Sequence, residues 1–197
     1  MNLLAHAYLS FDQPQLLVGN MISDYVKGKK QYDYPQGIQE GIRLHRAIDA
    51  FTDSHAATAR GKAIFKPAVG LYAGAFMDVV YDHFLALDSN IMDEAGWQNF
   101  SARVYTSLIA QHSFLPEKFA RMLPYMQTQD WLYNYRFTWG IEKSFGGLVR
   151  RAAYLSDSAV AFQLFEANLP LLADCYLDFF PAVKNMAESY WQDLQNH

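Results

Sequence analysis

The sequence predicts an all-α fold, a single-domain helical bundle that spans residues 1–197. Three observations predict it. Apolar residues recur every three or four positions along most of the chain, valine and isoleucine never alternate with polar residues over a strand's length, and turn signals are sparse. The hydrophobic fraction of 51% is enough for a sizeable core in 197 residues. We find no repeat or linker that would divide the chain into domains.

The individual helices follow from this spacing and from the residues that interrupt it. Pro170 and Pro181 are expected to end or kink the last helix, because proline lacks a backbone N–H. The polar stretches at 88–90 and 156–157 predict loops with capping residues. The predicted helices are 14–27, 36–55, 57–66, 70–87, 93–111, 115–127, 138–152 and 158–194.

Composition excludes several classes of protein. The aromatic fraction of 16% is too high for a disordered chain. Cys175 is the only cysteine, so no disulfide can form within the chain, which fits a reducing compartment, and we expect a cytoplasmic protein. Cys175 also lies in an apolar stripe, which favours a core position. The sequence has no run of about 18 apolar residues and no basic start typical of a signal peptide, so we expect no membrane partner.

Charge is unevenly distributed along the chain. The net charge is −4, yet residues 27–66 hold eight basic and four acidic side chains. An acidic protein with one basic segment is a poor general binder of nucleic acid, and we expect no nucleic-acid partner. The basic segment either forms an ordinary solvated helix surface or presents a positive face to an anionic partner.

Three predicted helices carry ionisable residues inside apolar stripes. In the helix at 36–55, one face is made of residues spaced 4, 3, 4 and 3: Ile38, Ile42, His45, Asp49 and Thr52. In the helix at 70–87, the same spacing gives Leu71, Ala75, Asp78, Asp82 and Leu85, and His83 follows directly. Asp24 follows Leu17 in the same way in the helix at 14–27.

Buried carboxylates must be stabilised, because each one left unpaired costs several kcal/mol. Protonation, pairing with Arg43 or Arg46, or a bound cation would each do this. A single divalent cation can hold several carboxylates and imidazoles together, and Mn²⁺, Mg²⁺ or Fe²⁺ suits such donors. Zinc is disfavoured, since one cysteine makes no thiolate cluster. The alternative is a set of hydrogen-bonded core residues without a metal.

An ordered series of motifs closely resembles the acyl carrier protein phosphodiesterase family. The motifs are Met1-Asn2-Leu3-Leu4-Ala5-His6, Gly19-Asn20 with Asp24, His45-Arg46-x-x-Asp49-x-x-Thr52-Asp53, Asp78-x-x-x-Asp82-His83-Phe84-Leu85 and Trp131-Leu132-x-x-Tyr135. The resemblance continues more loosely to Pro181 and so covers nearly the whole chain. Each fragment alone is weak, whereas their order and spacing together are specific.

The resemblance implies an activity and a fold. The activity is hydrolysis of the phosphodiester that joins 4′-phosphopantetheine to the serine of holo-acyl carrier protein, with Mn²⁺ as the usual metal, in fatty acid and lipid metabolism. The fold would be distantly similar to the HD-type metal-dependent phosphohydrolases. The adjacent His-Asp pair of HD enzymes is absent, because the neighbouring pair Asp82-His83 is reversed. The candidate metal ligands are His6, Asp24, His45, Asp49, Asp78 and Asp82.

Within that frame the remaining candidates have roles in catalysis or docking. Asp24 and Asp78 would act in catalysis, Arg46 or Arg43 would neutralise charge on the phosphoryl oxygens, and His83 would protonate the leaving serine. Acyl carrier proteins are acidic, so the basic segment becomes a docking face. Its expected contacts are Lys27, Lys29, Lys30 and Lys62.

Two other functions remain open from the sequence. One is a different metal phosphohydrolase, acting on a nucleotide or another small phosphate ester, with the same ligands but no need for a basic docking face. The other is a non-enzymatic helical bundle that binds an apolar ligand, with its buried acids held by arginine. The alternating aromatic residues at 131–139 predict core packing, with the wall of a pantetheine channel as the alternative.

Overall fold

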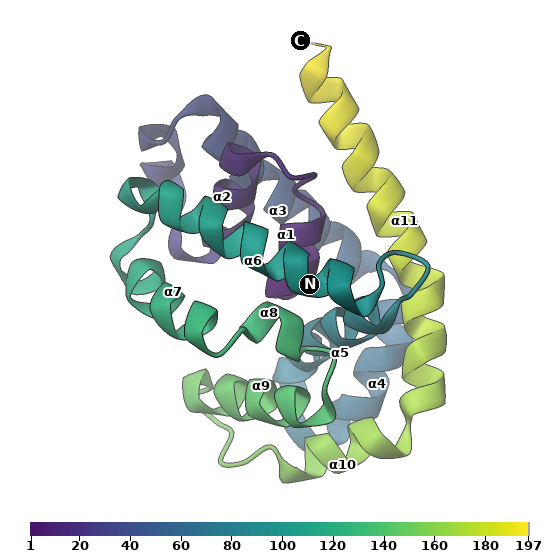
Figure 1. The fold of residues 1–197 in the computed structure, drawn as a ribbon. Coiled ribbons are helices and arrows are strands. Elements are labelled where there is room, and N and C mark those ends of the chain that lie inside the picture. The colour runs from purple at the N-terminus through teal and green to yellow at the C-terminus, as the bar shows by residue number, and fades with distance from the viewer. Residues whose placement is uncertain (197) are drawn as a thin grey trace.

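The computed structural model describes residues 1–196, which form an all-α fold and confirm the predicted fold class (Figure 1). The α-helices are α1 (Leu3–Tyr8), α2 (Pro14–Ile22), α3 (Gln36–Ser54), α4 (Ala56–Val69), α5 (Ala73–Leu87), α6 (Glu94–Ala110), α7 (Glu117–Thr128), α8 (Trp131–Asn134), α9 (Thr138–Arg151), α10 (Ala159–Ala167) and α11 (Leu169–Gln195). Short 3₁₀ helices join some of them: η1 (Ser23–Tyr25), η2 (Gly28–Asp33), η3 (Gly70–Tyr72) and η4 (His112–Phe114).

The structure departs from the predicted helices in a few places. The sequence did not predict α1 or α8, which are only 6 and 4 residues long. The expected last helix is divided at Asn168, with Pro170 in the first turn of α11, where its missing N–H costs nothing. Pro181 lies inside α11 and does not end it. The helix is visibly bent (Figure 1), as expected where proline removes a backbone hydrogen bond.

Helices α2 and α3 cross in direct backbone contact. A Cβ atom on Gly19 would lie 2.1 Å from the carbonyl oxygen of Ile38, and one on Gly41 would lie 2.2 Å from that of Leu16. Both distances are far below van der Waals contact, so only glycine allows the two helices to approach this closely. The crossing brings the end of α2 against the middle of α3.

Helices α4 and α5 form an antiparallel pair. The chain reverses at Gly70, whose φ of 55° suits glycine. A Cβ on Gly61 of α4 would lie 2.4 Å from the sulfur of Met77 in α5, and the hydroxyls of Thr58 and Tyr81 are 2.9 Å apart. By length and composition alone, the stretch Ala56–Leu87 could cross a membrane, but it is divided into these two packed helices.

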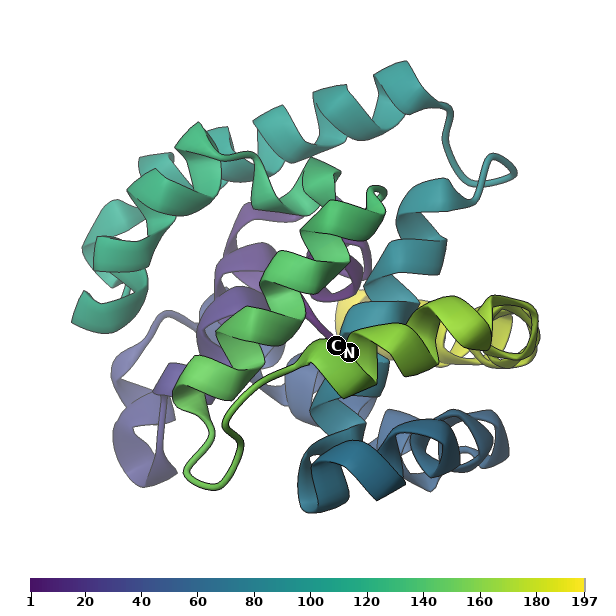
Figure 2. The ribbon, with the colours of Figure 1, turned by 90° about the horizontal axis from the view of Figure 1, so that it is seen from below.

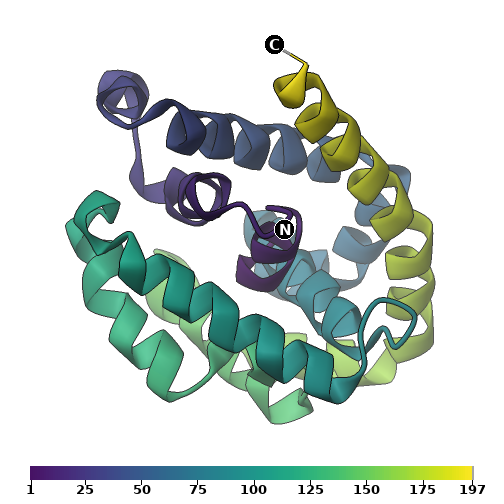
Figure 3. The same cartoon turned by 45° about the horizontal axis from the view of Figure 1, so that its top comes forward.

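The short helix α1 lies near the centre of the molecule (Figure 3). It packs between α2 and α5, and four of its six residues are buried. Helices α6 and α7 cover one side of this centre, whereas α3 and α11 lie on the other. Buried side chains from most of the helices form the core, including Cys175 as expected. Leu71 is fully exposed, contrary to the predicted stripe, because it lies in η3 before α5 begins.

Candidate metal centre

Two helices bring a cluster of ionisable side chains together. His6 comes from α1, whereas His45 and Asp49 lie one turn apart on α3. The two imidazole rings stack with their centroids 4.0 Å apart and their planes at 17°. Both histidines are buried, and the Asp49 side chain is 42% exposed, so the cluster is open to solvent on the side of Asp49.

Asn20, at the end of α2, holds both rings. Its Oδ1 accepts from Nδ1 of His6 at 2.7 Å, and its main-chain oxygen accepts from Nδ1 of His45 at 2.8 Å. The Asn20 amide nitrogen donates to the His6 carbonyl at 2.8 Å and to the Ser10 hydroxyl at 3.1 Å, which fixes its orientation. Because both acceptors are oxygens, each histidine carries a proton on Nδ1. The Nε2 lone pair of a neutral ring is therefore directed away from Asn20.

Both Nε2 atoms face the same carboxylate. His6 Nε2 lies 3.3 Å from Oδ1 of Asp49, and His45 Nε2 lies 3.1 Å from its Oδ2. Within residues 1–196, neither Nε2 has a partner in hydrogen-bonding geometry, although both atoms are buried. One donor atom from each of the three residues lies within 4.8 Å of the others. Histidines oriented through Nδ1, with Nε2 converging on a carboxylate, are the usual ligands of a divalent cation. We call His6, His45 and Asp49 the triad.

The triad residues differ in protonation. Burial and the nearby charge of His45 lower the pKa of His6 to about 4, so this ring is neutral at physiological pH. Burial also lowers the pKa of His45, but the close contacts with the charged carboxylates of Asp24 and Asp49 outweigh it and raise the pKa to about 9. The two histidines hold the pKa of Asp49 well below its usual range, in spite of burial. The metal-free triad thus binds one proton, on His45, which a bound cation would replace.

Asp24 lies beside the triad, on its solvent side. Its Oδ1 is 3.3 Å from Nε2 of His45, and its side chain is 80% exposed. The close contact with His45 lowers its pKa, so the carboxylate is ionised at neutral pH. The structure therefore places a second carboxylate at the opening of the site.

Asp78 is joined to the triad through the α-amino group of Met1. That nitrogen lies 3.0 Å from Oδ1 of Asp78 and 3.5 Å from Oδ1 of Asp49. Burial opposes the charge on this amine, but the two carboxylates outweigh burial and raise its pKa. Burial likewise raises the pKa of Asp78, against the effect of the amine.

Asp82 has different partners from those expected of a ligand. Its oxygens accept three backbone N–H groups at the start of α1, from Asn2 at 3.3 Å, Leu4 at 2.7 Å and Ala5 at 3.2 Å. Burial raises its pKa to about 7, although these N–H groups favour the ionised form. In the structure, Asp82 holds the N-terminus of the helix that carries His6, and its predicted role as a metal ligand stays a prediction.

His83 and Arg46 also have partners that sequence reasoning did not anticipate. Nδ1 of His83 donates to the carbonyl of Tyr135 at 2.7 Å, and its ring packs on Phe165 at 5.3 Å. The ring thus packs in the core on this side, and the assignment of His83 as a proton donor stays a prediction. Arg46 donates to Oε1 of Gln31 at 2.7 Å and so ties α3 to η2. Its predicted charge-neutralising role stays a prediction.

The expected docking lysines are at the surface. Lys27, Lys29 and Lys30 are exposed and follow Asp24 closely in the chain. Lys62 is half-buried, and its Nζ lies 3.4 Å from Oδ1 of Asp53. The aromatic residues at 131–139 have mixed environments, from buried Tyr135 to Trp139 with 43% exposure.

Arginine does not hold the acidic residues of the site. Within residues 1–196, no arginine nitrogen lies within 4.0 Å of a carboxylate oxygen of the four aspartates expected as ligands. These four are Asp24, Asp49, Asp78 and Asp82. The non-enzymatic alternative, in which arginine would stabilise the buried acids, is therefore wrong in its premise.

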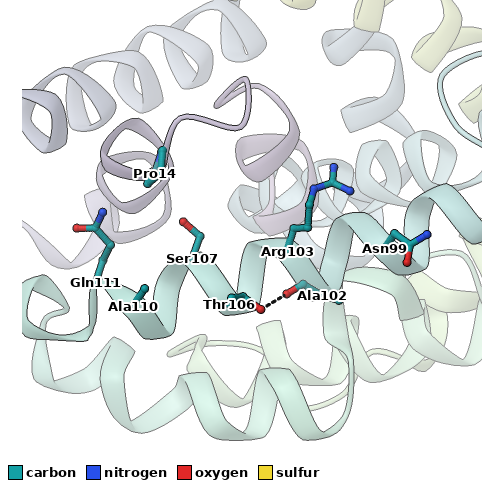
Figure 4. Close-up of a pocket in the computed structure, with 8 residues that line it drawn as sticks. All are labelled: Pro14, Asn99, Ala102, Arg103, Thr106, Ser107, Ala110 and Gln111. Atoms are coloured by element: carbon teal, nitrogen blue, oxygen red, sulfur yellow. Dashed lines mark hydrogen bonds between the residues drawn. The ribbon is translucent and has the colours of Figure 1, made fainter.

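A separate pocket of about 750 Å³ lies along α6 and the start of α2 (Figure 4). Its lining contains none of the triad, and Arg103 in it lies 3.6 Å from Oδ2 of Asp12. The lining residues are Pro14, Asn99, Ala102, Arg103, Thr106, Ser107, Ala110 and Gln111. They include no set of imidazoles and carboxylates, so the triad is the candidate reaction centre.

Comparison with known proteins identifies the family. A family model described as acyl carrier protein phosphodiesterase matches residues 1–183 of the chain. This chain belongs to that family. The recognition of the family from its ordered motifs is therefore confirmed.

Relatives named acyl carrier protein phosphodiesterase match almost end to end. The protein of Photorhabdus laumondii is 27% identical over 190 residues, which cover 96% of both chains. That of Klebsiella pneumoniae is 28% identical over 190 residues, covering 96% of this chain and 98% of the relative. That of Yersinia pestis is 27% identical over 189 residues, covering 95% and 98%. No solved structure matches the chain, and the expected likeness to HD-type phosphohydrolases stays a prediction.

Sequence reasoning missed the part that Asn20 plays. The residue stands in the motif Gly19-Asn20 and is completely buried, yet no role was predicted for it. A signal was present, because a buried amide in an apolar helix needs hydrogen-bond partners. The sequence could not show that those partners are the two histidines, which lie 14 and 25 residues away.

Proposed function

We propose that this protein is a metal-dependent phosphodiesterase that hydrolyses holo-acyl carrier protein to the apo carrier and 4′-phosphopantetheine. Membership of the family and the names of the relatives support the substrate. The observation that carries the chemistry is the convergence of two buried, unpartnered Nε2 atoms on the carboxylate of Asp49. We infer a cytoplasmic protein of fatty acid and lipid metabolism, in keeping with the proposed substrate.

The triad would hold the cation through His6 Nε2, His45 Nε2 and a carboxylate oxygen of Asp49. A divalent cation bound there supplies Lewis-acid polarisation of a phosphoryl oxygen and lowers the pKa of an attacking water. We propose Mn²⁺, because two imidazoles and carboxylate oxygens without thiolate suit it; Mg²⁺ and Fe²⁺ are the alternatives to compare. Asn20 keeps both rings in the tautomer that leaves Nε2 free for the cation.

Asp24 is the residue best placed to handle a proton during hydrolysis. It is ionised, lies on the solvent side of His45 and is mostly exposed, so a phosphodiester entering the opening meets it first. We propose that Asp24 orients the attacking water and accepts its proton, or completes the ligand set. Asp78 acts indirectly, through the Met1 amine, because its carboxylate and that of Asp49 contact the same amine.

The exposed lysines near the opening support an acidic protein as the substrate. Lys27, Lys29 and Lys30 follow Asp24 by three to six positions and have no carboxylate within 4.0 Å among residues 1–196. Long-range attraction of this kind speeds association and weakens with salt. Lys62 is a weaker candidate, because Asp53 already neutralises it.

The direct test is mass spectrometry of holo-acyl carrier protein after incubation with the protein and Mn²⁺. We expect the carrier to lose the mass of 4′-phosphopantetheine and the D49N variant to leave it intact. D53N is the matched control, because Asp53 lies one turn further along α3 and is exposed. An intact carrier together with hydrolysis of nucleotides by the wild-type protein would instead establish the small-phosphate-ester alternative.

A further inference from the structure

Helix α9 has an unusual solvent-facing side. Trp139, Lys143, Gly146, Gly147 and Arg150 share one face of the helix, at spacings of 4, 3, 1 and 3. Trp139, Lys143 and Arg150 are exposed, and the two glycines are half-buried. The ammonium group of Lys143 lies over the Trp139 ring, 4.7 Å from its centroid. We call these five residues and Arg151 the α9 face.

The two glycines of this face are not required by the packing of the protein. A Cβ atom on Gly146 or Gly147 would meet only guanidinium nitrogens of Arg150 and Arg151, at 3.7–3.8 Å, which is ordinary contact. By contrast, a Cβ on Gly140 in the same helix would lie 2.0 Å from a carbonyl oxygen. Glycine inside a helix costs about 1 kcal/mol relative to alanine. Two glycines without a packing reason leave a flat surface on which another molecule can approach the helix backbone.

The two arginines next to the glycines are available for a partner. Arg150 and Arg151 are exposed, and among residues 1–196 no carboxylate oxygen lies within 4.0 Å of either guanidinium. Five other arginines of the chain do have such a partner: Arg43, Arg60, Arg103, Arg121 and Arg136. Arg150 and Arg151 lie in the last turn of α9, where the helix dipole favours a cation. The dipole does not explain the adjacent glycines.

The end of α9 lies on the same side of the protein as the docking lysines. In Figures 1 and 2 this end of the helix and the segment that contains η1 and η2 lie on the same side of the molecule, at different heights in Figure 1. The charge of Arg151 is close enough to Tyr25 to lower the pKa of its phenol, against the larger effect of burial. Tyr25 is the neighbour of Asp24, whose carboxylate lies 3.3 Å from His45 Nε2. Cations from two distant segments therefore lie on the side of the molecule that carries Asp24.

We propose that the α9 face is the second half of the docking surface for the acyl carrier protein, opposite Lys27, Lys29 and Lys30. This inference rests on the proposed function. The occupant is an acidic segment of the carrier: its carboxylates pair with Arg150 and Arg151, which bind carboxylates through two parallel hydrogen bonds, and its backbone lies on Gly146 and Gly147. Contacts on both sides of the opening hold the modified serine over the triad.

The charge of the face is tested by binding of the apo carrier, which has no bond to cleave. We expect R150E/R151E to raise the Kd at least about tenfold at low salt and to raise the KM for the holo carrier similarly, with kcat nearly unchanged. K184E is the control, because it reverses a half-buried cation on α11, which runs along the opposite edge of the molecule (Figures 1 and 2). A Kd for R150E/R151E within twofold of that for K184E overturns the proposal.

The glycines provide a second, independent readout. G146A/G147A is expected to raise the melting temperature, because alanine favours the helix, and yet to weaken carrier binding about threefold or more by keeping the partner from the backbone. A purely structural role would move stability and binding in the same direction. Unchanged binding by this variant overturns the glycine part of the proposal.

The proposed function and the α9 face can fail separately. A wild-type protein that binds the carrier but releases no 4′-phosphopantetheine contradicts the proposed function alone. Hydrolysis by the wild type with an unchanged KM in R150E/R151E contradicts the α9 face alone. A wild-type protein that binds neither form of the carrier contradicts both.

Discussion

His6 and His45 stack 4.0 Å apart and both direct Nε2 at the carboxylate of Asp49, although they are 39 positions apart in the chain. Two imidazoles this close repel when both are charged, so the site holds a single positive charge between them. The pKa of His6 is lowered and that of His45 is raised, so this charge lies on His45. The following predictions depend on this pair and on the residues that hold it.

Asn20 is expected to control metal affinity. N20A removes the acceptor of the His6 Nδ1 proton but keeps the main-chain acceptor of His45, so only His6 loses its orientation. We expect the Kd for Mn²⁺, measured by titration calorimetry, to rise about 10- to 100-fold. N99A, at an exposed asparagine of α6, is the control and should bind Mn²⁺ as the wild type does. Equal affinities for N20A and N99A would show that Asn20 does not orient His6.

Metal binding is expected to release about one proton at pH 7.5, because the pKa of His45 is raised to about 9 and that of His6 is lowered to about 4. Below pH 9 the apparent Kd for Mn²⁺ should rise about tenfold for each unit of decrease in pH. Calorimetry in buffers of different ionisation enthalpy measures the number of protons. A value near zero would mean that His45 is neutral before the metal binds.

The stability of the metal-free protein should fall as the pH rises, whereas the affinity for Mn²⁺ should increase. The pKa of His45 in the folded state is about 9, above its ordinary value, so protonation of His45 stabilises the fold. This stabilisation is complete below pH 6.5. This stabilisation is lost as the pH rises to about 9, and the raised pKa of the Met1 amine acts in the same direction. Urea unfolding of the metal-free protein should therefore show a falling free energy of unfolding over this window. With saturating Mn²⁺ the fall should disappear.

Asp82 is expected to matter first for stability. D82A leaves three backbone N–H groups at the start of α1 without an acceptor, and each costs about 1 kcal/mol or more. We expect the free energy of unfolding, measured with urea, to fall by about 3 kcal/mol, and metal affinity to fall with it because α1 carries His6. D88A is a comparison at a carboxylate near the end of α5 that is partly exposed. A stable D82A protein that binds no metal would instead mark Asp82 as a ligand.

The crossing of α2 and α3 is expected to tolerate no side chain. G41A places a Cβ 2.2 Å from the Leu16 carbonyl, so the two helices must separate, and Asn20 moves away from His45. We expect loss of both metal binding and several degrees of melting temperature. G74A is the control, since a Cβ on Gly74 of α5 meets no atom within 4 Å, and alanine should stabilise that helix slightly. A G41A protein as stable as G74A would contradict the close crossing.

The helices were predictable because their period is local. Residues three and four apart share a face whatever the rest of the chain does, so the stripe from Ile38 to Thr52 was predicted correctly, with four buried residues and half-buried Asp49. Helix α1 was not predictable in this way. It is too short to be stable alone, and it is held by a carboxylate from α5, about 80 positions away.

The sequence by itself determined the all-α class, the family and the His45–Asp49 pair, because periodicity and ordered motifs can be recognised in the linear sequence. Tertiary structure alone decided which of the other acids join that pair. Asp24 and Asp78 reach it, directly and through the Met1 amine, whereas Asp82 on the same face as Asp78 binds backbone N–H groups instead. The physical reason is that a helical face fixes directions, whereas the depth and angle at which helices cross, set here by Gly19 and Gly41, fix the distances that a metal requires.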